Sequence, residues 1–379
     1  MDLQLSDQQE QRREDVRQFC LQEIVPHADQ FDRQQRLPPE LIDKLAGRGY
    51  LGSFLAESWG GSGLDLLTYG LLTEEIGKAC SSVRSLLTVH DMVATAILRW
   101  GNQEQRAAWL PLLASGQKVA AFAASEPDAG SDLRSVQTTA VSTANGYVLN
   151  GLKKWITFGQ VADLFLVLAR LDDKPSAFLV ERHRSGLSTR PIGDLLGVRA
   201  SMLAEVELTD CRVPASHLLG RAGFGLASVI STALGMGRYS VAWGCVGIAQ
   251  ACLDACVRYT SQRRQFGAPL KEHQLIRQMI SDMVVNVKAA RMLCCRAACL
   301  KISGDPREVM ETLIAKYFAS QAAMKSASDA VQIHGANGCG GQYPVQRYMR
   351  DAKIMEIIEG SNQLQQLLIA DYGYQEGTR

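Results

Sequence analysis

Near the end of the chain the sequence reads Arg350-Asp-Ala-Lys-Ile-Met-Glu-Ile-Ile-Glu-Gly-Ser-Asn-Gln-Leu-Gln-Gln366. One carboxylate, Glu359, stands between a pair of isoleucines and a Gly-Ser-Asn break, after which apolar spacing resumes over 364–369. If this carboxylate is buried, it is poorly solvated, and desolvation raises its pKa toward the range of a general base. The alternative is a solvated glutamate at a loop tip. Glu359 is therefore the first candidate for a catalytic residue.

The composition describes an ordinary soluble protein of two or three domains. The chain has 379 residues, of which 46% are hydrophobic and 21% charged, and a formal net charge of +1. This balance gives no argument for binding to nucleic acid or to an anionic membrane. The first sixteen residues are dense in Gln, Glu, Asp and Arg, and no run approaches the ~20 apolar residues of a membrane span. We expect a cytoplasmic protein without a membrane segment.

The ten cysteines raise the question of metal sites or disulfides. Cys252 and Cys256, like Cys295 and Cys299, are four residues apart in helix-like segments without His or Asp at ligand spacing. No C-x-x-C pair occurs. We therefore predict reduced thiols in the core and no metal centre.

The hydrophobic period divides the chain into three regions, expected at 1–116, 117–223 and 224–379. Helical spacing dominates the first and third regions, whereas short segments with Gly and Pro between them fill the middle one. Asn145-Gly146 joins two strand-like segments and predicts a hairpin. The main expected helices are 66–78, 86–100, 103–113, 226–263, 273–302 and 306–333. The expected strands are 137–141, 147–149, 164–168, 177–180 and 203–208.

Four further segments have residue types suited to a large flavin or phosphate ligand. The first, Phe122-Ala-Ala-Ser-Glu-Pro-Asp-Ala-Gly-Ser-Asp132, supplies hydroxyls and free N–H groups in one turn, although a surface turn has the same composition. The second, Lys154-Trp-Ile-Thr157, places an aromatic beside a hydroxyl, and the alternative is a Trp that anchors a sheet edge.

The other two segments lie in the third region. Arg263-Arg-Gln-Phe-Gly267, followed by Gln274, offers a bidentate cation and an aromatic to a pyrophosphate, or else forms a solvated helix end. Gln332-Ile-His-Gly-Ala-Asn-Gly338 is a glycine-rich loop, which alone is weak evidence. We expect His334 to form local hydrogen bonds rather than to catalyse.

These segments, in this order, resemble the signatures of the acyl-CoA dehydrogenase family. The C-terminal stretch resembles Tyr-Arg-Asp-Ala-(Lys/Arg)-Ile-x-x-Ile-Tyr-Glu-Gly-Thr, with Ile358 for Tyr and Ser361 for Thr. In the Gly-rich loop Ala336 replaces a Gly, and Gly235 stands where short-chain relatives have Asp. An isovaleryl-type subfamily has its catalytic Glu at the position of Gly237. In this chain Glu359 is the base that the resemblance implies.

The resemblance implies an α+β fold with an N-terminal helical domain, a middle β-barrel-like domain and a C-terminal four-helix bundle. It also implies FAD as the cofactor, removal of an α-proton by Glu359 and transfer of the β-hydrogen to FAD as hydride. The FAD-binding residues carried over are Phe122, Ala124, Ser125, Gly130, Ser131, Trp155, Ile156, Thr157, Arg263, Phe266, Gln274, Gln332, Ile333, Gly335, Ala336, Ser361, Asn362 and Gln363. The substrate-binding residues are Ser131, Gly235, Met236, Arg238 and Gly360.

The substrate is expected to be an acyl thioester on carrier protein or CoA. Strings at 80–85, 239–248 and 351–360 look closest to acyl-carrier-protein dehydrogenases of methoxymalonyl extender-unit formation in polyketide antibiotic biosynthesis. A glyceryl thioester would then yield a 2-hydroxy-3-oxo thioester, and a seryl thioester would lead toward aminomalonyl. The alternatives are a catabolic short- or branched-chain acyl-CoA dehydrogenase, and a flavin monooxygenase or DNA-associated flavoprotein. The implied partners are an electron-transfer flavoprotein and further copies in a homodimer or homotetramer.

Overall fold

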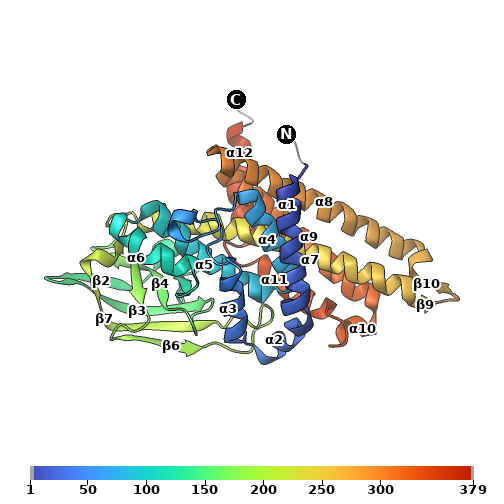
Figure 1. Cartoon of the computed structure of the whole chain (residues 1–379), viewed down its shortest axis with the longest axis horizontal. Coiled ribbons are helices and arrows are strands. Elements are labelled where there is room, and N and C mark those ends of the chain that lie inside the picture. Colours follow the sequence, from blue (N-terminus) through green and yellow to red (C-terminus); the bar gives the residue numbers. More distant parts are fainter. Residues whose placement is uncertain (1–3, 377–379) are drawn as a thin grey trace.

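The computed structural model describes residues 4–376 and places a sheet between two groups of helices along the sequence (Figure 1). Within the N-terminal group, Ser6 and Gln9 form the capping box that begins the first helix. A π-helical turn, Cys20–Ile24, and a 3₁₀ turn, Val25–His27, extend that helix. The α-helices of this group are α1 (Asp7–Phe19), α2 (Ala28–Gln34), α3 (Pro39–Gly47), α4 (Leu66–Ala79), α5 (Ser81–Trp100) and α6 (Gln103–Ala114).

Helix α5 begins five residues earlier than the hydrophobic period predicts. Its first turns contain Ser81, Ser82, Arg84 and Ser85, which are polar but buried. Polar side chains in a buried helix remove the apolar spacing that marks a helix in the sequence. The start of α5 is therefore decided by tertiary packing.

The middle of the chain forms one eight-stranded sheet in the order β6-β7-β3-β2-β4-β5-β8, with β1 paired parallel to β4. The predicted hairpin is present, because Thr143 pairs with Gly146, which has a φ of 139°. Strand β3 extends well beyond the predicted 147–149. The sequence pattern missed β8, which has only two residues, and β6, which has a single hydrophobic residue. The strands are β1 (Ala120–Ala123), β2 (Thr139–Thr143), β3 (Gly146–Ile156), β4 (Leu164–Leu171), β5 (Lys174–Glu181), β6 (Leu187–Pro191), β7 (Ala204–Pro214) and β8 (Leu218–Leu219).

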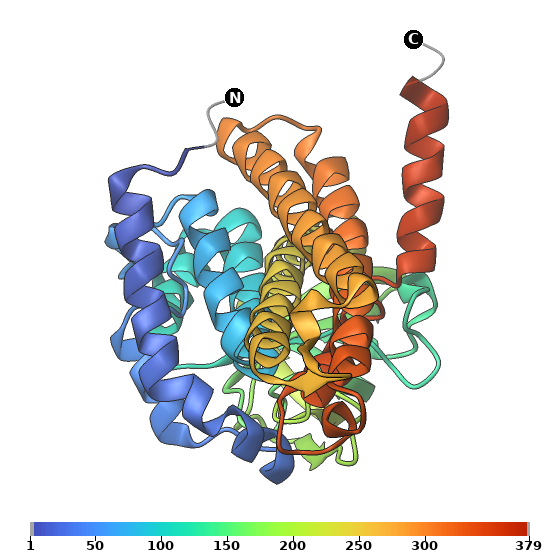
Figure 2. The ribbon, with the colours of Figure 1, turned by 90° about the vertical axis from the view of Figure 1, so that its right-hand side faces the viewer.

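Three long helices dominate the C-terminal group, and α12 stands at its side (Figure 2). A small hairpin, β9 (Arg264–Gln265) and β10 (Ala268–Pro269), separates the first two long helices at the end of the molecule away from the sheet (Figure 1). The helices are α7 (Ser231–Gln262), α8 (Gln274–Ser303), α9 (Glu308–His334), α10 (Ala336–Cys339), α11 (Val345–Met355) and α12 (Asn362–Glu376).

Helix α7, with the π-helical turn before it, is long and apolar enough by composition to cross a membrane. Its most apolar window, however, is 78% buried by the rest of the protein. Trp243 and Tyr239 on this helix are fully buried between other helices. This is the pattern of a central core helix.

The stretch before Glu359 ties all three regions together. The Arg350 guanidinium donates to both carboxylate oxygens of Asp32 on α2, at 3.0 and 2.6 Å, and to the carbonyl oxygen of Leu196. Asp351 is buried and accepts a hydrogen bond from the Val198 N–H at 2.6 Å. Because α11 is anchored on two sides, the segment that follows it has a defined path.

Candidate active site

Glu359 follows α11 in a left-handed conformation, with a φ of 56°, and Gly360 follows with a φ of 94°. For a residue with a side chain this backbone costs roughly 1–2 kcal/mol. Oε2 of Glu359 is buried and has no hydrogen-bond partner within the described residues. Burial raises the pKa of Glu359 from 4.5 to about 6, against the opposing effects of Arg238, Lys316 and Arg84. Glu359 is half-buried as a residue, and its buried Oε2 is not the exposed carboxylate of a solvated loop tip.

The carboxylate of Glu359 occupies space that only glycine leaves free on α7. A Cβ added at Gly237 would lie 2.7 Å from Glu359 Oε2 and 2.8 Å from its Cδ. The same Cβ would lie 2.7 Å from the sulfur of Met92 on α5. Position 237 is therefore adjacent to the Glu359 carboxylate. This agrees with the resemblance, in which the isovaleryl-type subfamily has its catalytic Glu at this position.

Two cationic side chains hold the backbone around the base. Nε of Arg238 donates to the carbonyl oxygen of Glu359 at 3.0 Å. Nζ of Lys316, on α9, donates to the carbonyl oxygen of Gly360 at 2.9 Å. Gln365 also donates to the Gly360 carbonyl, at 3.1 Å. The left-handed pair is therefore fixed from α7, α9 and α12.

The loop after β1 is braced by a buried ion pair. Glu126 and Lys153 are 2.6 Å apart and almost fully buried. Glu126 also accepts hydrogen bonds from the N–H groups of Gln137 and Thr138, at 2.5 and 2.9 Å. The neighbouring Lys154 N–H donates to the Ser125 carbonyl at 3.0 Å. These bonds place the first two predicted FAD segments side by side.

Trp155 lies at an irregularity in the pairing of β3 with β7, between Lys153 and Ile156. It has a φ of 63°, and 53% of the residue is exposed. Bulges and positive φ at aromatic residues re-aim a side chain away from the regular sheet. Ile156 is buried and Thr157 is half-buried. An exposed indole beside a half-accessible hydroxyl suits the planar ring system of a flavin.

The third and fourth predicted FAD segments meet at the far end of the helices. Tyr259 on α7 stacks on His334, with ring centroids 4.1 Å apart, and the Asn337 amide donates to the Tyr259 hydroxyl at 2.9 Å. Arg263 is exposed at the end of α7, and Phe266 is 97% exposed with a φ of 51°. This end lies opposite the sheet (Figure 1). A single chain therefore separates the two halves of the predicted FAD site.

The remaining predicted site residues differ in accessibility. Gln274, Gln332, Gly335, Ala336 and Gln363 are exposed, as are Gly130 and Ser131. Phe122, Ser125, Gly235, Gly360 and Ser361 are half-buried. Ala124, Ile333 and Met236 are buried, so their backbone atoms are the groups left for a ligand. Asn362 is buried too, and its Oδ1 accepts from Lys316 and Ser320 at 3.2 and 3.0 Å.

Sequence reasoning missed two buried cations near the base. Lys316 is fully buried on α9, and Arg84 is 1% exposed on α5. Arg84 donates to the hydroxyls of Thr88 and Ser85, at 2.8 and 3.3 Å, while its Nε has no partner among the described residues. For Lys316 the signal in the sequence was its spacing, because it follows Thr312 and precedes Ala319 and Ala323, all buried, at helical intervals.

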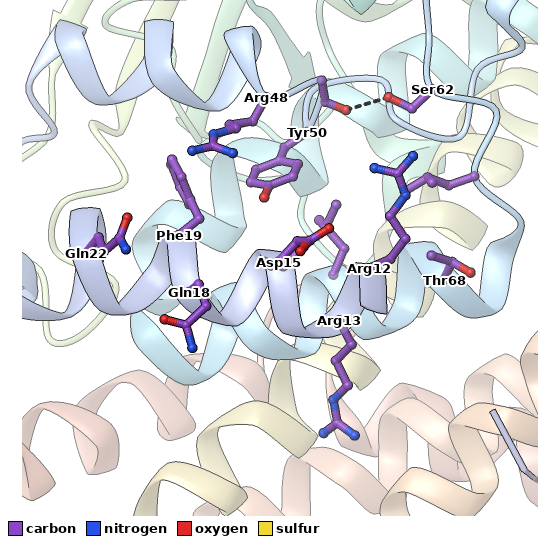
Figure 3. A pocket seen from close by; sticks show the side chains of 14 residues that line it. Arg12, Arg13, Asp15, Gln18, Phe19, Gln22, Arg48, Tyr50, Ser62 and Thr68 are labelled. Atoms are coloured by element: carbon purple, nitrogen blue, oxygen red, sulfur yellow. Dashed lines mark hydrogen bonds between the residues drawn. The ribbon is translucent and has the colours of Figure 1, made fainter. Parts of the chain in front are cut away.

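A cavity lies elsewhere, between α1 and the segment after α3 (Figure 3). Its volume is about 400 Å³, and Arg12, Arg48 and Tyr50 line it with Ser62, which donates to the Gly49 carbonyl. None of the predicted site residues lines this cavity. This cavity is therefore separate from the segment around Glu359.

Comparison with known proteins agrees with this fold. Three family descriptions match in order: acyl-CoA dehydrogenase N-terminal domain over residues 6–117, middle domain over 121–211 and C-terminal domain over 223–373. The probable acyl-CoA dehydrogenase YngJ of Bacillus subtilis is 40% identical over 98% of this chain and 99% of its own.

Two solved structures are similar over nearly the whole chain. Butyryl-CoA dehydrogenase from Megasphaera elsdenii is 36% identical with a TM-score of 0.95, covering 98% of this chain and 99% of its own. FkbI, described for biosynthesis of a methoxymalonyl extender unit, is 33% identical with a TM-score of 0.88, covering 96% of this chain and 99% of its own.

Fold and site together define an FAD-dependent oxidoreductase that acts on a CH–CH bond. The chain belongs to the acyl-CoA dehydrogenase family. The residues present fit FAD, because Trp155 is exposed beside the braced Ser125 loop, and Arg263 and Phe266 are unburied.

Proposed function

We propose that the protein dehydrogenates a short acyl-CoA thioester between its α- and β-carbons in the cytoplasm, with Glu359 as the base. The observation that carries this proposal is the unpartnered Oε2 of Glu359, buried beside Gly237. The similarity to butyryl-CoA dehydrogenase and to bacterial acyl-CoA dehydrogenases supports a CoA substrate over a carrier protein.

In this reaction the Glu359 carboxylate takes the α-proton, and the β-hydrogen leaves with its electron pair, so that an enoyl thioester forms. FAD, when bound, would supply the acceptor for that hydride, and an electron-transfer flavoprotein is the proposed acceptor of the electrons. Ser125, Trp155, Thr157 and the partner copy of Arg263 are the residues proposed to hold it.

Charge develops on the thioester carbonyl oxygen as the proton leaves. The structure gives the Glu359 N–H no acceptor within residues 4–376, so this donor is free to bind that oxygen. A donor aimed at developing charge typically contributes 10²- to 10³-fold to kcat. Arg238 and Lys316 keep this N–H in place because they bind the two carbonyls that follow it.

A second candidate substrate is a thioester with an oxygen-bearing acyl group, such as glyceryl on acyl carrier protein. The observation that favours it is the polar cluster near the base. Arg84 is buried without a carboxylate partner among the described residues, and Thr88 contacts Ser240 at 2.7 Å through their hydroxyls. A plain alkyl chain gains little from such groups, whereas a hydroxyl or carboxylate satisfies them.

The test is anaerobic mixing of the yellow holoenzyme with butyryl-CoA or with glyceryl acyl carrier protein, followed by flavin absorbance. We expect rapid bleaching with butyryl-CoA. Bleaching by the glyceryl thioester alone would select the second candidate and place the enzyme in extender-unit formation. Absence of bleaching with both, from an FAD-replete enzyme, would contradict both substrates.

A further inference from the structure

Lys316 is a buried cation that makes no ion pair. It lies on α9 with no exposed surface. Its ammonium donates to two neutral acceptors, the Gly360 carbonyl at 2.9 Å and Asn362 Oδ1 at 3.2 Å. Within residues 4–376, no carboxylate oxygen lies within the 4.0 Å of an ion pair. Burial of a charge without an ionic partner costs free energy of folding, so we expect Lys316 to have a role that compensates for this cost.

The acceptors of Lys316 belong to the segment that contains the base. Gly360 directly follows Glu359, and both residues are in the left-handed region. Asn362 begins α12, and its Oδ1 also accepts from the Ser320 hydroxyl, one turn further along α9. Lys316 therefore connects α9 to both ends of the turn between Glu359 and α12.

The charge of Lys316 acts on the base across this turn. The ionisable groups near it are Glu359 and Glu356 from the segment after α11, and Cys245 and Arg238 from α7. Burial lowers the pKa of Lys316 to about 8, against the effects of Cys245 and Glu359, so that its side chain remains charged at neutral pH. That charge, after Arg238, opposes the rise in the pKa of Glu359 that burial causes.

We propose that Lys316 is a positioning residue for Glu359: it holds the left-handed turn behind the base and keeps the buried carboxylate ionised, ready to accept a proton. This inference rests on the proposed role of Glu359. The hydrogen bond to the Gly360 carbonyl fixes the position of the Glu359 carboxylate. The positive charge of Lys316 favours the ionised form of this carboxylate in the enzyme without substrate.

Two variants separate the charge from the hydrogen bond. Lys316→Gln removes the charge but retains a donor for the Gly360 carbonyl, and Lys316→Arg retains the charge. Lys325→Met is the control, since Lys325 lies on the exposed side of α9 and pairs with Asp329. For each holoenzyme, kcat/KM is measured from pH 5 to 9, together with FAD content and Tm.

In the wild type we expect kcat/KM to fall tenfold per pH unit below about pH 6, because the protonated Glu359 accepts no proton. In Lys316→Gln this limb should move upward by about one pH unit or more, since an opposite charge nearby lowers a carboxyl pKa by about that amount. Lys316→Arg and Lys325→Met should retain the wild-type limb.

An unchanged acid limb in a folded, FAD-replete Lys316→Gln enzyme would overturn the proposal. If that variant does not fold, the same limb is measured in Lys316→Arg, where an upward shift with the charge retained would also overturn it. The role of Glu359 is tested separately. An active Glu359→Gln enzyme would contradict the role of Glu359 as the base. An inactive Glu359→Gln enzyme, together with an unchanged acid limb in Lys316→Gln, would contradict only the role of Lys316.

Discussion

The carboxylate of Glu359 occupies the space that a side chain at Gly237 would fill. A Cβ at residue 237 would lie 2.7 Å from Glu359 Oε2, closer than real Cβ atoms approach other heavy atoms. Because Gly237 on α7 has no side chain, the Glu359 carboxylate, from the turn between α11 and α12, can lie against this helix. Gly237 thus helps to set the position of the Glu359 carboxylate although it has no functional group.

Gly237→Ala is expected to displace the Glu359 carboxylate while the protein still folds, because the groups that must move, this carboxylate and the Met92 sulfur, are the ends of flexible side chains. A displacement of about 1 Å at a reacting group costs roughly 10²-fold in rate. The measurement is kcat/KM on butyryl-CoA, with FAD content and Tm. Gly373→Ala is the control, since a Cβ there on α12 meets no atom within 4 Å. An alanine variant with wild-type kcat/KM would contradict the steric argument.

Glu359→Gln should retain FAD and assembly but lose roughly 10²- to 10⁴-fold of kcat, the usual contribution of a positioned base. The amide has nearly the shape of the carboxylate and accepts no proton. Glu356→Gln, three residues earlier and half-buried beside Lys353, is the matched control. Turnover of Glu359→Gln above half of the wild-type rate would exclude Glu359 as the base.

Arg84→Met tests the polar cluster without a large change in side-chain length. Burial of a charge without an ionic partner is costly, so its replacement by an apolar side chain of similar length removes that cost, and we expect a folded enzyme. If the acyl group carries oxygen, kcat/KM should fall at least tenfold for glyceryl acyl carrier protein relative to butyryl-CoA. Arg258→Met, at an exposed position of α7, serves as the control. An equal effect on both thioesters would show that Arg84 does not select the acyl group.

Arg263→Ala tests whether the far end of the helices completes the FAD site of a second copy. Arg263 and the almost fully exposed Phe266 lie at the end opposite the sheet. We expect weaker FAD retention and weaker assembly together, measured by flavin absorbance and by light scattering after gel filtration. Lys271→Ala, exposed just before α8, should leave both unchanged. An FAD-replete oligomer of wild-type size from Arg263→Ala would contradict the intersubunit role.

The sequence predicted the long elements because their patterns are local. The spacing of α4, α6, α7, α8 and α9 and the Asn145-Gly146 hairpin are each visible within one short window. Strand β8 was missed, since two residues are too few to show a period, and β6 was missed because Leu187 is its only hydrophobic residue. The start of α5 was missed for the opposite reason, because its buried residues are polar.

By itself the sequence pointed to the family and the helix–sheet–helix order, and it predicted Glu359 as the base, because each depends on residue types at fixed spacing. Only the tertiary structure showed that Lys316 and Arg84 are buried cations near that base and that Gly237 makes room for its carboxylate. It also showed that the β9–β10 hairpin, which Arg263 directly precedes, lies at the end of the molecule away from the sheet. The physical reason is that burial, electrostatic coupling and steric exclusion arise between segments far apart in sequence, where no local pattern records them.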